Sequence, residues 1–375
     1  MPPPLPTPPF PAKPHTAEQL QLDSTSHFGQ RPCRWQSDIA FQLVHRRNLV
    51  SISATGSGKS FIFWLPMLYE NGLTIIVVPL KNLGQQLADE SSRRGFCTVS
   101  VTAELLGESL TLLEEIKCLQ FRTVVLSPEL AVDPRFMRIW NEPKIKKKIN
   151  RVIIDEAHCV SQWGRDFRSS YLHLSCLHAV LGEVSWYLTS ATLHSHVLQD
   201  TLRIIGLHRN TMIYCRSNDR PNIHLCVRKM KYSITSHLDL AFLVPLNPEI
   251  DNSDWVRQNI PQFLIYCNSQ VDAESTALFL RSRIPVHARH RIVWYHSGMS
   301  DAFKKETIEE YERGGILGLC CTDACGMGLD LRRVRIVVQY RLLKKIDAIV
   351  QRFGRAGRDS SIQATAILLV EKTYF

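Results

Sequence analysis

Short apolar runs recur along the chain, and the longer segments between them carry apolar residues at helix-like spacing. Runs such as residues 74–78 and 123–126 contain no charged side chain, which is typical of strands that a parallel sheet buries on both faces. We therefore predict an α/β fold with two mainly parallel sheets flanked by helices. The predicted strands are residues 49–52, 74–78, 123–126, 152–155 and 186–188 in a first series, and residues 263–267, 291–296, 316–322, 334–340 and 365–370 in a second.

Proline and polar residues mark the limits of the predicted domains. Proline dominates the first fifteen residues, so we expect residues 1–19 to form a disordered leader. A leader of this composition either binds an SH3-like protein or is an inert tail, and the tail is the commoner case. A polar stretch with one proline, residues 216–222, separates the two series of strands. We therefore predict one domain over residues 20–215 and a second over residues 216–375.

The charge and the cysteines narrow the class of protein. A formal net charge of +10 over 375 residues favours a polyanionic partner such as nucleic acid, although an even excess of surface Lys and Arg gives the same total. Eleven cysteines occur without a Cys-x-x-Cys pair, so we expect neither a disulfide framework nor a structural zinc ion.

No segment of the sequence is typical of membrane insertion or secretion. The longest apolar stretch is too short to span a bilayer, and the N-terminus has no basic region followed by an apolar core. We therefore expect a soluble protein, with no membrane partner, that is not secreted. Its expected location is the nucleus in a eukaryote and the cytoplasm otherwise.

A phosphate-binding loop is predicted over residues 53–60, which read SATGSGKS. The loop follows the predicted strand 49–52 and precedes the apolar segment 61–65, which is the order of strand, glycine loop and helix in a Walker A site. The strict motif has glycine where this chain has Ser53, so the assignment depends on this context and on a pair of acids further along the chain.

The residues of this loop have separate predicted roles toward a magnesium nucleotide. The two glycines allow backbone amides to close around the phosphates. The Lys59 ammonium reaches the β- and γ-phosphates, and the Ser60 hydroxyl is a magnesium ligand. The predicted ATP contacts are Thr55, Gly56, Ser57, Gly58, Lys59 and Ser60.

Two adjacent acids, Asp155 and Glu156, follow the predicted strand 152–155 at its carboxyl end, where open α/β sheets bind ligands. One carboxylate can hold a hydrated magnesium ion while the next orients the water that attacks the γ-phosphate. Such a pair is also common in the first turn of a helix. The phosphate loop upstream favours the catalytic interpretation, with Asp155 as the metal ligand.

Aromatic rings and arginines alternate without helix or strand periodicity over residues 161–168. Rings beside cations suit unstacked bases and a phosphate backbone. The rings could equally belong to the core. We take the first interpretation and predict nucleic-acid contacts from Trp163, Arg165, Phe167 and Arg168.

The second domain has no phosphate loop, but residues 351–359 read QRFGRAGRD. Arg355 and Arg358 lie one helical turn apart in number, so both point to one side if the segment is helical. Arginines of this kind stabilise charge on a transferring phosphoryl group, although a surface basic helix end is the alternative.

Two further loops follow predicted strands. Residues 322–330 form a glycine-bearing loop suited to backbone approach by a phosphate. Ser190-Ala191-Thr192 either couples the nucleotide site to the domain cleft or merely ends a strand.

These motifs resemble the helicase core of the RecQ family, within helicase superfamily 2, over about residues 25–375. The specific part is a DEAH box that runs into an aromatic-rich loop, residues 155–164 followed by 166–168. Further similar segments are Phe28-Gly29 with Arg34 and Gln36, residues 78–85, 219–222, 263–269, 295–298, 322–330 and 351–359.

The resemblance implies two tandem RecA-like domains, each a mainly parallel sheet flanked by helices. It implies ATP and Mg²⁺ as cofactors, single-stranded and forked DNA as partners, 3′-to-5′ translocation with unwinding, and a place in DNA repair and recombination. By the same resemblance, Gln36 reads the adenine, His158 belongs to the catalytic DEAH box, and Asp330 contributes to nucleotide binding.

The chain also departs from the family pattern. Arg165 stands where the family usually has histidine, Leu331-Arg332 replaces Lys-Pro, and Arg34 and Gln36 are one residue closer than usual.

The sequence stops at Phe375 without the family's zinc-binding, winged-helix and HRDC modules, so we expect weak unwinding that is confined to short tailed duplexes. The alternatives are a DNA-stimulated ATPase that does not unwind efficiently and a non-hydrolysing, ATP-gated DNA-binding protein. The acids and the arginines argue against the latter.

Overall fold

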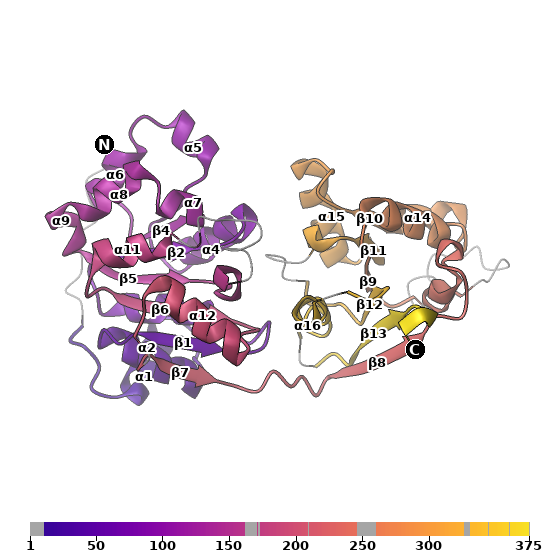
Figure 1. The fold of residues 1–375 in the computed structure, drawn as a ribbon, viewed down its shortest axis with the longest axis horizontal. Helices are drawn as coiled ribbons and strands as arrows, with labels where there is room; N and C mark the ends of the chain where they lie inside the picture. The colour runs from indigo at the N-terminus through magenta and orange to yellow at the C-terminus, as the bar shows by residue number, and fades with distance from the viewer. Residues whose placement is uncertain are drawn as a thin grey trace. The chain divides into compact units, whose positions relative to one another are not determined.

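A parallel sheet of seven strands forms the centre of the N-terminal unit (Figure 1). In this computed structural model the described residues are 11–161, 171, 173–208, 210–245, 260–325, 331–343, 345–359 and 361–374. The strands lie in the order β3-β4-β2-β5-β6-β1-β7. They are β1 (Leu49–Ile52), β2 (Leu73–Val77), β3 (Thr98–Ser100), β4 (Thr123–Leu126), β5 (Ile149–Ile154), β6 (Ser185–Ser190) and β7 (Met212–Cys215).

Helices bury both faces of this sheet, which is why its central strands are buried along their length and mostly apolar. Ile75 and Val77 of β2 point into one core and Ile76 points into the other, as the pleat requires. One face is covered by α5 (Ala103–Glu108), α6 (Leu112–Lys117), α7 (Pro128–Ala131), α8 (Pro134–Asn141), α9 (Pro143–Lys146), α11 (Leu174–Leu181) and α12 (Ser195–Ile205). The other is covered by α1 (Ala17–Phe28), α2 (Arg34–Val44), α3 (Phe61–Trp64), the 3₁₀ helix η1 (Leu65–Leu68) and α4 (Lys81–Arg93).

The strand order brings three loops together. Strands β5, β6 and β1 are direct neighbours and all run in the same direction, so the segments that follow them leave from one edge of the sheet. These segments begin at Asp155, at Ala191 and at Ser53. The acid pair, the Ser190-Ala191-Thr192 segment and the phosphate loop therefore meet at the carboxyl end of the sheet.

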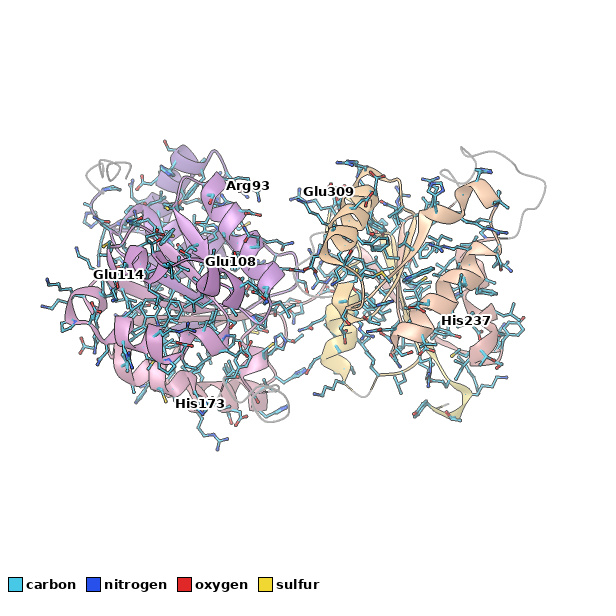
Figure 2. The ribbon with its side chains drawn as sticks, turned by 90° about the horizontal axis from the view of Figure 1, so that it is seen from above. Arg93, Glu108, Glu114, His173, His237 and Glu309 are labelled. Atoms are coloured by element: carbon cyan, nitrogen blue, oxygen red, sulfur yellow. The ribbon has the colours of Figure 1, made fainter. Side chains whose placement is uncertain are left out.

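The C-terminal unit, Asp219–Phe375, has its own parallel sheet of six strands in the order β10-β11-β9-β12-β13-β8. Its strands are β8 (Ile223–Lys229), β9 (Phe263–Tyr266), β10 (Ile292–Tyr295), β11 (Gly318–Cys321), β12 (Ile336–Tyr340) and β13 (Ala364–Val370). Its helices are η3 (Ile234–Ser236), η4 (Leu238–Leu243), α14 (Gln270–Arg281), η5 (Val286–Arg291), α15 (Asp301–Arg313), η6 (Asp323–Cys325), α16 (Ile346–Phe353) and η7 (Lys372–Tyr374). Figure 2 draws the side chains, with Glu309 marking α15.

The prediction of two mainly parallel sheets flanked by helices is confirmed, and every predicted strand is present within three residues of its observed bounds at either end. Three strands were not predicted: β3, β7 and β8. All three are at the edges of their sheets. Edge strands have less apolar burial and therefore a weaker sequence signal; Leu225 and Val227 of β8, for example, are exposed.

The N-terminal end of the folded chain lies earlier than the sequence suggests. Helix α1 begins at Ala17, where the Thr16 hydroxyl accepts a hydrogen bond from the Gln19 amide. The last three residues of the predicted leader are therefore helical, which corrects that boundary.

The sequence predicts a domain boundary near residue 216, and the two units divide after Asn218. Within the described part of the chain, no helix has the length and apolar character needed to cross a membrane.

Candidate nucleotide site and arginine loop

The phosphate loop leaves β1 at Ser53 and enters α3 at Phe61. Gly56 and Gly58 both have positive φ, 78° and 81°, in the left-handed region that favours glycine. The amides of Phe61 and Ile62 then donate to the carbonyl oxygens of Gly58 and Lys59, which makes a tight entry into the helix. The loop thus has the backbone conformation that lets amide groups surround an anion.

Two polar side chains close this loop on itself. The Lys59 ammonium donates to the carbonyl oxygens of Ser53, at 2.8 Å, and Ala54, at 3.0 Å. The Ser53 hydroxyl, at the position where the strict motif has glycine, lies 3.0 Å from the Ser57 hydroxyl. Ser53 is buried, so this serine fits the loop and its hydroxyl links the start of the loop to its middle.

Gln36 is buried against the phosphate loop from the first turn of α2. Its side-chain amide donates to the Gly58 carbonyl at 2.8 Å, and its side-chain oxygen accepts from the Cys33 amide at 2.7 Å. A Cβ atom at position 58 would lie 2.8 Å from the Gln36 nitrogen, so the contact also needs glycine there. The residue predicted to read adenine is therefore tied directly to the loop predicted to bind phosphate.

Asp155 and Glu156 stand at the end of β5. The Asp155 carboxylate accepts from the Glu156 amide at 2.9 Å, and the Asp155 amide continues the sheet by donating to Val77. Glu156 has φ of +50°, which costs a non-glycine residue energy and is found most often at functional sites. Burial and the neighbouring Glu156 raise the pKa of Asp155 to about 7, against the opposing effect of the Lys59 ammonium.

These residues fit a magnesium nucleotide. A partly buried carboxylate with a raised pKa gains most from a cation, and carboxylate and hydroxyl oxygens are the ligands that Mg²⁺ prefers. Asp155 and Ser60 supply those groups, and the glycines supply the anion cradle. The described residues contain no cluster of three His, Cys, Asp or Glu side chains able to hold a metal ion by themselves.

His158 joins the acid pair to the next strand. Its Nδ1 atom lies 2.9 Å from the Ser190 hydroxyl at the end of β6 and 3.3 Å from a Glu156 carboxylate oxygen. The Ser190 hydroxyl also accepts from the Thr192 amide, and the Ser190 carbonyl accepts from the amide of Ser53 in the phosphate loop. Ser190 thus contacts both predicted motifs, although the sequence prediction did not include it among the site residues.

The predicted DNA contacts Trp163, Arg165, Phe167 and Arg168 lie outside the described residues, and so does Asp330.

The arginine segment of the C-terminal unit is not helical beyond Phe353. Helix α16 ends at Phe353, and Gly354 caps it. Arg355 and Arg358 follow in a turn, which we call the arginine loop (residues 354–359). The condition under which helical spacing would place both arginines on one side is therefore not met. The backbone at Gly357 has φ of +48°, which a continuing helix cannot have.

A buried arginine of α16 was missed by the sequence prediction. Arg352 donates from Nε and Nη2 to one Asp323 carboxylate oxygen, at 3.0 and 2.7 Å, and its guanidinium lies 5.0 Å from the centre of the Tyr266 ring. Asp323 belongs to the glycine-bearing segment 322–330. Arg352 therefore joins two predicted motifs, and its place three residues before Arg355 was the available signal.

Each of the two units matches a family of helicase domains. The DEAD/DEAH box helicase family matches residues 33–201, and the helicase conserved C-terminal domain matches residues 250–360. Among curated proteins, the chain is 30% identical over 353 residues to the ATP-dependent DNA helicase RecQ of Haemophilus influenzae, which covers 92% of this chain and 52% of that protein.

Two further relatives extend this similarity. The bifunctional 3′-5′ exonuclease/ATP-dependent helicase WRN of Mus musculus is 32% identical over 94% of this chain and 24% of its own length. The probable ATP-dependent DNA helicase RecS of Bacillus subtilis is 28% identical over 89% of this chain and 63% of its own length. The chain thus spans about half the length of the RecQ relative and about a quarter of the WRN relative.

Solved structures show the same fold at low sequence identity. The helicase MrfA bound to DNA and AMPPNP has a TM-score of 0.74 at 17% identity, over 96% of this chain and 51% of that one. The DEAD-box helicase Mss116 bound to single-stranded RNA has a TM-score of 0.73 at 16% identity, over 96% of this chain and 76% of that one. The fold prediction of two tandem RecA-like domains is confirmed.

Proposed function

The chain belongs to the RecQ family of helicases, as its helicase core, and on that premise we propose that it is an ATP-dependent DNA helicase or translocase that moves 3′ to 5′ along single-stranded DNA. One observation carries this proposal: polar contacts through His158 and Ser190 join the Asp155-Glu156 pair to the phosphate loop at the carboxyl end of the N-terminal sheet. A phosphate cradle beside a water-orienting acid is what nucleotide hydrolysis requires. RecQ, WRN and RecS are named as helicases, which supports the coupling of hydrolysis to movement.

Each side chain has a proposed task in hydrolysis. Lys59 binds the β- and γ-phosphates, and Ser60 and Asp155 hold Mg²⁺, which neutralises phosphate charge when bound. Glu156 accepts a proton from the attacking water, and His158 keeps the Glu156 carboxylate in place through the contact at 3.3 Å. Arg355 and Arg358 supply the positive charge that stabilises the transferring phosphoryl group, and the segment 326–330 is proposed to contact the nucleotide through Asp330.

Replacing Gln36 is expected to weaken ATP binding rather than catalysis. Gln36→Ala removes the hydrogen bond to Gly58 and, by the proposed function, a contact to adenine. We expect the KM for ATP to rise roughly 2- to 13-fold, the range for one hydrogen bond, with kcat nearly unchanged. Steady-state ATPase measurements with ATP and with GTP check this. If Gln36 reads adenine, the loss must be larger for ATP than for GTP, and an equal loss would limit Gln36 to a structural role in the loop.

Replacing Trp163 tests the proposed link between DNA and hydrolysis. Trp163 follows the acid pair closely in sequence, and we propose that Trp163, Arg165, Phe167 and Arg168 contact single-stranded DNA. Trp163→Ala is expected to lower DNA-stimulated ATPase much more than basal ATPase, with a loss of about 1 to 3 kcal/mol if the ring stacks on a base. The comparison is Trp140→Phe in the core of α8, which loses ring volume and the indole hydrogen bond to the Ala131 carbonyl and so shows how a core change affects both activities and stability. A parallel fall in both activities and in thermal stability would assign Trp163 to the core.

Strand displacement tests the proposed polarity. With ATP present, the chain is expected to separate a short duplex that has a 3′ single-stranded tail and to leave a matched duplex with a 5′ tail intact. Displacement that proceeds equally from both tails, or that proceeds without ATP, would contradict the proposal. The DNA affinity should also fall steeply as salt rises, because Lys and Arg contacts to phosphates release counterions.

A further inference from the structure

The polar segment that opens the C-terminal unit packs against the arginine loop. The guanidinium of Arg220 donates through Nη2 to the Gly357 carbonyl, and the same nitrogen lies 3.5 Å from the Ala356 carbonyl oxygen. The side-chain amide of Asn222 donates to the same Gly357 carbonyl at 2.8 Å. Two side chains of one short segment therefore bind one carbonyl oxygen, and that carbonyl lies in the chain between Arg355 and Arg358.

Asn222 also holds the far end of the loop. Its amide donates to the Ile362 carbonyl at 3.0 Å, and its backbone carbonyl accepts from the Ala364 amide at 2.9 Å, where β13 begins. A single side chain thus bridges the middle of the arginine loop and its return to the sheet. Asn222 is 8% exposed, so water cannot easily replace these bonds.

The loop has little freedom to adopt another shape. A Cβ atom at Gly357 would lie 2.7 Å from the Asn222 amide nitrogen and 3.1 Å from the Ala364 Cβ atom. The Gly357 amide donates to the Val334 carbonyl at 2.9 Å, so both sides of this residue are bonded. The Arg220 Nε atom lies 3.4 Å from the Asn222 side-chain oxygen, which orients the amide so that its donors face the loop.

The hydrogen bonds of Arg220 and Asn222 do more than fix the start of β8. Capping β8 would need one bond to the neighbouring strand, and the Asn222 backbone carbonyl already provides it at Ala364. The side-chain bonds instead converge on the peptide between the two arginines. A shift of this peptide would move Arg355 and Arg358 together, and a displacement of about an ångström is enough to lower a catalytic rate about 100-fold.

We propose that Arg220 and Asn222 are positioning residues that hold the arginine loop in the shape required for Arg355 and Arg358 to act in ATP hydrolysis. This inference rests on the proposed function for the role of the arginines. It adds two residues, outside the nucleotide and arginine motifs, that determine the rate of hydrolysis without contacting the nucleotide themselves.

The test compares three variants of the full chain. Asn222→Asp keeps the size of the side chain but turns a carboxylate oxygen toward the two carbonyls, Arg220→Ala removes the second donor, and Arg220→Lys keeps one. The control is Arg289→Ala, which removes an exposed arginine of η5 in the same unit. The measurements are kcat and KM for DNA-stimulated ATP hydrolysis, thermal unfolding, and amide hydrogen exchange in peptides that span the arginine loop.

We expect Asn222→Asp and Arg220→Ala to lower kcat about 10- to 100-fold with KM for ATP nearly unchanged, because the phosphate loop is in the other unit. Arg220→Lys should fall between Arg220→Ala and the unchanged chain, and exchange should rise in the arginine loop before it rises in β13. Unchanged kcat in an active protein would overturn the inference. If amide hydrogen exchange in the arginine loop is the same in the variants as in the chain without substitutions, the inference is overturned, and this test holds even if the protein hydrolyses no ATP. If the chain without substitutions hydrolyses no ATP, only the proposed function is overturned.

Discussion

Glu156→Gln is expected to bind ATP as tightly as the unchanged chain and to hydrolyse it about 10²- to 10⁴-fold more slowly, the range for losing a general base. Glutamine keeps the size and hydrogen-bonding capacity of the side chain but cannot take a proton from water. The phosphate loop and Asp155 are untouched, so nucleotide affinity should persist. Titration with a fluorescent ATP analogue and a phosphate-release assay measure the two properties separately.

Two further variants make this result specific. Lys59→Ala should lose binding as well as hydrolysis, since the ammonium contacts the phosphates in the bound state. Glu108→Gln makes the same chemical change at an exposed residue that ends α5 and should leave both properties unchanged (Figure 2). If Glu156→Gln turns over at a rate near that of Glu108→Gln, Glu156 has no part in the chemistry.

Arg358→Ala is expected to slow hydrolysis by about 10³ to 10⁵, the effect of removing an arginine that stabilises the transferring phosphoryl group elsewhere. Arg358 is half-buried, whereas Arg355 is only 4% exposed and contributes to packing as well as charge. Arg358 is therefore the cleaner test, because its removal should change the melting temperature little.

The control for Arg358→Ala is again Arg289→Ala, which removes the same positive charge from the protein. ATP binding measured by titration should stay within about twofold in both variants, because the phosphate loop provides most of the contacts. A normal rate for Arg358→Ala would remove this residue from the mechanism. A fall in rate matched by an equal fall in stability would make it structural.

The strands of both sheets could be predicted because their residues are buried on both faces, which leaves uninterrupted apolar runs. The unpredicted strands show where this signal ends. In β7, Met212, Ile213 and Cys215 are exposed, and in β8 polar and apolar residues mix because the strand has a neighbour on one side only. Their pairing depends on contacts with strands far away in the sequence, such as β8 with β13.

The parts of the site whose residues are neighbours in the sequence could be predicted. The phosphate loop and the acid pair are each contiguous, so residue types and spacing were sufficient to propose them. Ser190 and Asn222 act through partners that are distant in sequence, and no spacing rule indicates such pairs. The helical interpretation of Arg355 and Arg358 was avoidable, because Gly354 and Gly357 are signals that a helix ends there.

The most direct test of the account is phosphate release by the full chain with ATP and Mg²⁺, measured with and without single-stranded DNA and repeated with Glu156→Gln. We expect slow release without DNA, a clear increase when single-stranded DNA is added, and loss of both activities in the variant. The central claim would be contradicted by a chain that binds ATP but releases no phosphate with DNA present, or by release that Glu156→Gln leaves unchanged.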